Sequence, residues 1–129
     1  MLQFWPILVL SLSAIAGISD NLRLNVVYGD NKTQFELSNA STGAILKYQS
    51  YNQNSKTINV SPKDYKFVSA QASEILKLES DKRTCLRNFI ELIATANGQQ
   101  VKRFACIGSE IPISRKMTNL ANTMDIQVF

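Results

Sequence analysis

The chain contains no histidine among its 129 residues. Histidine is the usual general base of hydrolytic enzymes and the commonest side-chain ligand of transition metals. Its absence excludes Ser-His-Asp and Cys-His mechanisms, and a metal site would have to be built from oxygen ligands. The Asp-x-Asp-x-Asp pattern of a calcium loop is also missing. We therefore expect neither a bound metal ion nor histidine-dependent catalysis.

Cysteine, glycine and proline are scarce as well. Two cysteines exclude a cysteine-dense miniprotein and a four-thiolate zinc site. The five glycines are all isolated, which excludes a glycine-rich phosphate-binding loop. A composition of 45% hydrophobic and 19% charged residues is typical of a globular domain, and the length allows one such domain. The formal charge of +4 is only mildly basic.

The first 19 residues carry no charged side chain. Ile7 to Leu12 form an apolar core, and Ala14 and Ala16 fit the small-residue positions of a signal-peptidase site. A cleavage site after Ser19 is a second option. An uncleaved anchor is a third, because the uncharged stretch reaches the ~18 residues that a membrane-spanning helix needs.

Pro6 and the small residues that follow the apolar core argue against an anchor. We predict that residues 1–16 form a cleaved signal peptide and that residues 17–129 form one small domain. The mature protein is then secreted or periplasmic and has no transmembrane span.

Cys85 and Cys106 are predicted to form a disulfide, because an exported chain meets an oxidising compartment. The chain-entropy model gives about 3 kcal/mol of stabilisation for a loop of this size. The alternative, two buried free thiols in a cytosolic protein, requires that the signal-peptide prediction be wrong.

The first third of the mature chain alternates like an antiparallel sheet. Leu22 to Val26 and Phe35 to Leu37 flank a turn at Gly29–Asn31. After the turn-forming residues 39–43, a second pair of strands is predicted at residues 44–48 and 57–60.

A helix is predicted to begin at Pro62. Ser61 can cap the first free amides, Pro62 suits the first helical position, and Asp64 can complete an acidic variant of the capping box. From there to Leu78 the apolar residues, including Phe67, gather on about half of the helix surface. The predicted fold is α+β: an antiparallel sheet covered by this main helix. The alternative is an all-β sandwich in which residues 65–78 are extended.

Asn97-Gly98 lies between two apolar, β-branched runs, which is a strong hairpin signal. A two-residue loop there pairs Cys106 with Phe89, about 13 Å along the strand from where Cys85 would lie. We therefore expect either a shifted register or, preferably, that the chain before the hairpin curls back over it.

The C-terminal segment is predicted to contain a short helix capped by Ser114. Its apolar residues would be Met117, Leu120, Ala121 and Met124. Residues 125–129 are predicted to form a closing strand.

The remaining routes to catalysis are weak. The pairs Ser80/Lys82 and Ser114/Lys116 are two residues apart, and no serine has the lysine three positions later that a Ser-Lys mechanism uses. Paired carboxylates could act without histidine, but the candidates lack an apolar setting that would raise a pKa: Glu36, Glu74, Glu79, Asp81 and Glu91. We predict no enzyme activity and no cofactor.

Basic residues gather around the predicted hairpin. They form a candidate patch for an anionic partner, either an anionic glycan or an acidic protein: Lys82, Arg83, Arg87, Lys102 and Arg103. Charge is too sparse and aromatics too few for a nucleic-acid interface. The alternative is that these cations protect the edge of the sheet against aggregation.

Three classes of function remain. A non-catalytic binding or inhibitory module is favoured, because small exported domains with a disulfide and no catalytic groups commonly serve recognition. A structural component of the envelope or extracellular matrix is the alternative, and an enzyme is the least favoured. Sequons at Asn31, Asn39 and Asn59 are easily produced by chance in a chain rich in Asn, Ser and Thr.

Overall fold

A computed structural model describes residues 21–40, 43–51, 53–85, 87–96 and 98–129. The predicted signal peptide, residues 1–16, lies outside this range. Across the described segments, none of the helices combines the length and the apolar character needed to cross a membrane.

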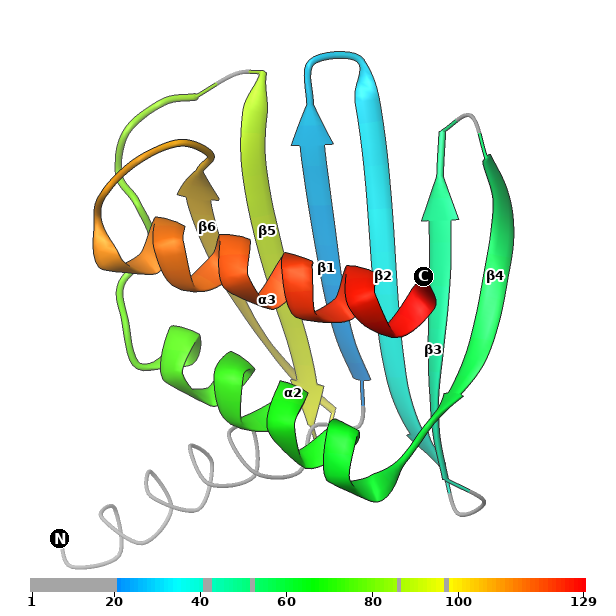
Figure 1. The fold of residues 1–129 in the computed structure, drawn as a ribbon. Coiled ribbons are helices and arrows are strands. Elements are labelled where there is room, and N and C mark those ends of the chain that lie inside the picture. The colour runs from blue at the N-terminus through cyan, green and yellow to red at the C-terminus, as the bar shows by residue number, and fades with distance from the viewer. Residues whose placement is uncertain (1–20, 41–42, 52, 86, 97) are drawn as a thin grey trace, which may run out of the picture.

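An antiparallel sheet forms the larger layer of the molecule (Figure 1). The described residues contribute six strands in the order β4-β3-β2-β1-β5-β6. The four N-terminal strands form a simple meander, and β5 then returns to pair with the open side of β1. The strands are β1 (Asn21–Tyr28), β2 (Asn31–Ala40), β3 (Gly43–Ser50), β4 (Gln53–Val60), β5 (Asn88–Ala96) and β6 (Gln99–Cys106).

Two helices, α2 (Pro62–Leu76) and α3 (Pro112–Val128), cover the same face of the sheet (Figure 1). The predicted α+β fold is confirmed, and the all-β alternative is wrong. The start of α2 follows the predicted chemistry, because the Asp64 backbone N–H donates to Ser61 Oγ at 3.1 Å and Pro62 occupies the first turn. We call the side of the sheet that carries the helices the covered face, and the other side the uncovered face.

The core lies between the covered face and the two helices. Strand alternation sends every second side chain of the sheet inward, including the fully buried Leu24 and Leu92. From α3, Met117, Leu120 and Met124 have no exposed surface. Burying each side chain of this size contributes about 2 kcal/mol.

The C-terminal segment differs from the prediction. Residues 125–129 do not form a strand, because α3 continues to Val128 and buries that side chain. The N-cap position of α3 is Ile111, which makes no side-chain capping hydrogen bond, and not Ser114. Ser114 lies in the first turn of the helix, and its buried hydroxyl donates to the Cys106 carbonyl. Six buried side chains at helical spacing outweigh the short alternation at the end of the chain: Ile113, Ser114, Met117, Leu120, Met124 and Val128.

Phe67 is a second difference. Its side chain is 56% exposed, although the sequence analysis placed it on the buried half of the helix. The buried positions of α2 are Val68, Ser69, Ala72, Ile75 and Leu76. At 100° per residue, Phe67 lies outside the arc that these positions define.

Candidate functional site

The connection between α2 and β5 runs along the outer edge of β6. We call residues 78–85 the strap. The Asp81 backbone N–H donates to the Phe104 carbonyl at 2.8 Å, and the Phe104 N–H donates to Ser80 Oγ at 3.0 Å. The strap therefore occupies backbone groups that an edge strand otherwise offers to another chain.

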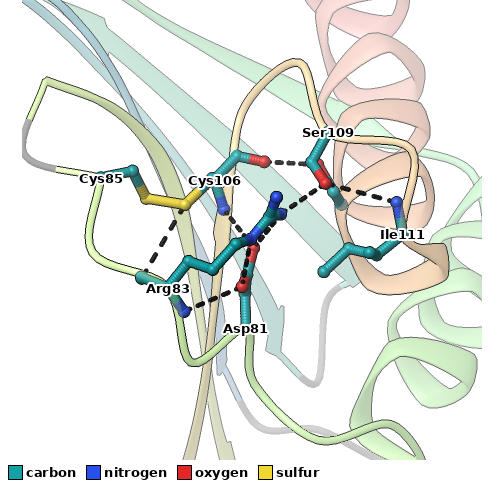
Figure 2. Close-up of a disulfide and its surroundings, with 7 residues drawn as sticks. Asp81, Arg83, Cys85, Cys106, Ser109 and Ile111 are labelled. Carbon is teal, nitrogen blue, oxygen red and sulfur yellow. Dashed lines mark hydrogen bonds and ion pairs between the residues drawn. A yellow bond between two sulfur atoms is a disulfide. The ribbon is translucent and has the colours of Figure 1, made fainter.

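The disulfide anchors the end of the strap, as Figure 2 shows. The predicted hairpin register is confirmed, since Cys106 lies opposite Phe89 and Ala96 opposite Gln99. Cys85 reaches Cys106 because the strap curls back beside β6, and the two Cα atoms are 5.7 Å apart. The predicted disulfide and the preferred account of its geometry are both confirmed.

Asp81 is the buried polar centre of the strap. Its carboxylate accepts hydrogen bonds from Arg83 Nη2 at 2.7 Å, Arg83 Nε at 3.0 Å and the Arg83 backbone N–H at 3.0 Å. The Cys106 N–H donates to it at 3.4 Å. These hydrogen bonds, chiefly from the Arg83 side chain, hold the pKa of Asp81 far below its usual range.

Arg83 also connects the strap to the loop before α3. Its Nη2 donates to Ser109 Oγ, and the same hydroxyl accepts from the Ile111 N–H at 3.3 Å (Figure 2). The carboxylate of Asp81 raises the pKa of Arg83. Arg83 thus has a structural role within the molecule.

Arg103 also has intramolecular partners. It pairs across the strands with Leu92, so it lies on the covered face and not with its neighbour Lys102. Its Nε donates to the Leu78 carbonyl at 2.6 Å and its Nη2 to the Leu76 carbonyl at 2.8 Å. Arg103 therefore satisfies carbonyls at the C-terminal end of α2.

The other three residues of the candidate patch, Lys82, Arg87 and Lys102, are exposed. In the parts of the chain that the structure describes, none of them has an ion-pair partner. Lys82 lies on the strap, Arg87 immediately precedes β5 beside the Gly29 turn, and Lys102 lies on the uncovered face of β6.

An aromatic pair lies between Arg87 and Lys102 along the strands β5 and β6. Phe89 and Phe104 belong to the uncovered face of β5 and β6, and their ring centroids are 5.3 Å apart. Both side chains are half-buried. We call the set of Lys82, Arg87, Lys102 and the two rings the β5–β6 patch.

Four of the five carboxylates considered for catalysis have partners within the molecule. Glu36 accepts from Asn21 Nδ2 at 3.0 Å and from Arg23 at 3.2 Å, and these contacts, led by Asn21, lower its pKa. Glu91 accepts from Asn25 Nδ2 at 3.2 Å. Glu74 pairs with Lys77 at 2.8 Å along the helix, and Asp81 pairs with Arg83.

The buried role of Asp81 was not predicted, because the sequence places no apolar residues around this carboxylate. The one pattern in the sequence that could have indicated this role is an aspartate two residues before an arginine, and that arrangement is common on protein surfaces. The capping role of Arg103 had no local signal, because the carbonyls that it contacts are about 25 residues away.

The sequence matches no protein-family model, and no similar curated protein was found.

Proposed function

We propose that this protein is a small exported binding module, without catalytic activity, that recognises an anionic glycan through the β5–β6 patch. The charge-free N-terminal segment supports export, and the disulfide is compatible with an oxidising compartment. The observation that carries the proposal is a set of three exposed cations without ion-pair partners among the described residues, together with a half-buried aromatic pair on the uncovered face.

The division of the basic residues supports this site. Arg83 and Arg103 have partners inside the molecule, so a ligand would have to displace existing hydrogen bonds. Ligand binding has no such cost at Lys82, Arg87 and Lys102, because no internal ion pair has to be broken there. The rings of Phe89 and Phe104 offer an apolar surface on which the flat side of a sugar ring can lie.

The spacing of the cations favours a linear polyanion. About 13 Å of strand separates Lys102 from the end of β6 that lies beside Arg87, and the three cations do not converge on one point. A glycan with repeated carboxylate or sulfate groups matches that spacing better than a single small anion. Electrostatic binding of this kind weakens as salt is added.

Chromatography on heparin-agarose tests the proposal, with heparin as the anionic glycan. A variant with Lys82→Gln, Arg87→Gln and Lys102→Gln should elute at clearly lower salt than the unmodified protein. The matched control, Lys63→Gln, Lys66→Gln and Arg115→Gln, removes the same charge from exposed helical positions and should elute closer to the unmodified protein.

Equal elution of the two variants would show that only net charge matters, and the proposed site would be wrong. The same pair of variants on immobilised polyglutamate distinguishes the ligand class. If the patch determines retention on polyglutamate but not on heparin, the partner is an acidic protein instead of a glycan.

A further inference from the structure

The second edge of the sheet lies on β4, and none of the described segments covers it. β4 pairs with β3 along one side. Among the described residues, nothing forms backbone hydrogen bonds with its other side. Alternate N–H and C=O groups of an edge strand point away from the sheet, and they provide a template for another strand.

β4 has few of the features by which edge strands usually prevent pairing. It contains no proline, and its sequence carries a single charge, on Lys56. The Lys56 ammonium lies 4.0 Å from the centre of the Phe129 ring. The register irregularity with β3 lies between Tyr48 and Ser50, so residues 56–60 form a regular strand.

Exposed apolar side chains gather beside this edge. Phe129 is 64% exposed and packs edge-on against Tyr48 of β3. Ile126, three residues earlier, is on the same side of the last turn of α3 and is 74% exposed. Tyr51, in the turn that leads into β4, is also largely exposed. An apolar border next to unpaired backbone groups is the chemistry of a strand-pairing interface.

We propose that β4 pairs with β4 of a second copy of this chain, antiparallel and across a two-fold axis. Such pairing is self-complementary, because each strand supplies the same groups to the other. This β4–β4 pairing continues the antiparallel sheet from one copy into the other. The two-fold axis keeps the helices of both copies on the same face of the joined sheet. The occupant of the edge is thus another molecule of the same protein.

Charge determines the register of this pairing. A register centred on Lys56 would place two ammonium groups opposite each other, which is unfavourable. Centring the pair on Ile58 places Lys56 opposite Val60 of the second copy and Thr57 opposite Asn59. The half-buried Ile58 side chains then meet at the axis on the covered face.

The strap determines where the assembly stops. Among the described residues, each copy has one edge without a covering segment, since the strap occupies outer backbone groups of Phe104 and Cys106 on β6. Pairing through β4 uses the open edge of each copy. The two β6 edges, which carry the straps, then lie at the two ends of the joined sheet. The expected assembly is therefore a closed dimer and not a filament.

Analytical ultracentrifugation over a concentration series tests the proposal. The unmodified protein should shift from monomer to dimer as its concentration rises. The variant Thr57→Lys/Asn59→Lys places like charges opposite each other twice, and its dimerisation should be at least tenfold weaker. The control Gln49→Lys/Gln100→Lys adds the same charge at exposed positions of the uncovered face away from the edge, and should still dimerise.

A cysteine cross-link tests the register even where a charged variant folds poorly. Ile58→Cys should give a disulfide-linked dimer on oxidation, because directly opposed residues lie within disulfide reach. Lys56→Cys should not, since the two positions would be about 13 Å apart. A protein that stays monomeric at high concentration, equal dimerisation of both charge variants, or open-ended oligomers would each overturn the proposal.

Discussion

The outer strands β6 and β4 have very different surroundings. Eight connecting residues, a disulfide and a buried carboxylate lie along the outer side of β6. β4 is regular over residues 56–60, carries one lysine and has a border of exposed apolar side chains. The contrast indicates that the β6 edge is stabilised within the molecule, whereas the β4 edge remains available for association. Substitutions near β6 should therefore alter the stability of the monomer, and those on β4 its assembly.

Removing the disulfide should have the largest effect on stability. Cys85→Ala/Cys106→Ala is expected to lower the free energy of unfolding by about 3 kcal/mol, because the unfolded chain regains the freedom of the closed loop. Urea unfolding measures the change, and the reduced unmodified protein should behave like the variant. A free energy of unfolding within ~0.5 kcal/mol of the unmodified protein would show that the strap does not need this covalent anchor.

Removing the Arg103 side chain should have a smaller effect. Arg103→Ala leaves the Leu76 and Leu78 carbonyls without their donor and should lower the free energy of unfolding by about 2 kcal/mol. Lys102→Ala, on the opposite face of the same strand, should change it by less than ~0.5 kcal/mol. Similar losses in both variants would contradict the division between structural and exposed cations.

Asp81→Asn should have an effect that depends on pH. The folded state lowers the pKa of Asp81 from its ordinary value of 3.8, so the ionised carboxylate stabilises the fold above that pH. The unmodified protein should be the more stable of the two at pH 5–7. The difference should then narrow as the pH falls below about 4, because the carboxylate of Asp81 takes up a proton in the unfolded chain before it does so in the folded state.

Urea midpoints at pH 7, 5, 4 and 3 measure this narrowing. Glu79→Gln, on an exposed neighbour in the strap, is the control and should change little at neutral pH. A constant difference between Asp81→Asn and the unmodified protein across this range would assign the effect to packing and not to charge.

Local chemistry made much of the fold predictable. Ser61 and Pro62 define the start of α2, and the Asn-Gly pair defines the β5–β6 register, although Asn97 itself lies outside the described residues. These signals depend on residues a few positions apart. The disulfide was predicted from the compartment argument, and the same register then required the chain before the hairpin to curl back toward Cys106.

Features that depend on distant residues were not predictable in the same way. The central position of β1 requires its pairing with β5, where Asn25 and Glu91 are 66 residues apart. The partners of Asp81 and Arg103 likewise come from separate elements. For residues 125–129, two apolar residues at alternate positions fit a strand as well as a helix, and packing against β3 and β4 decides between them.

The central position of β1 has a consequence for the order of folding. β1 is synthesised before the other five described strands. One side of β1 nevertheless has no partner until β5 has been synthesised. The β1–β4 meander has local contacts and can form early, with two open edges instead of one. We therefore expect docking of the β5–β6 hairpin onto β1 to limit the rate of folding, and the nascent chain to be most prone to aggregation before that step.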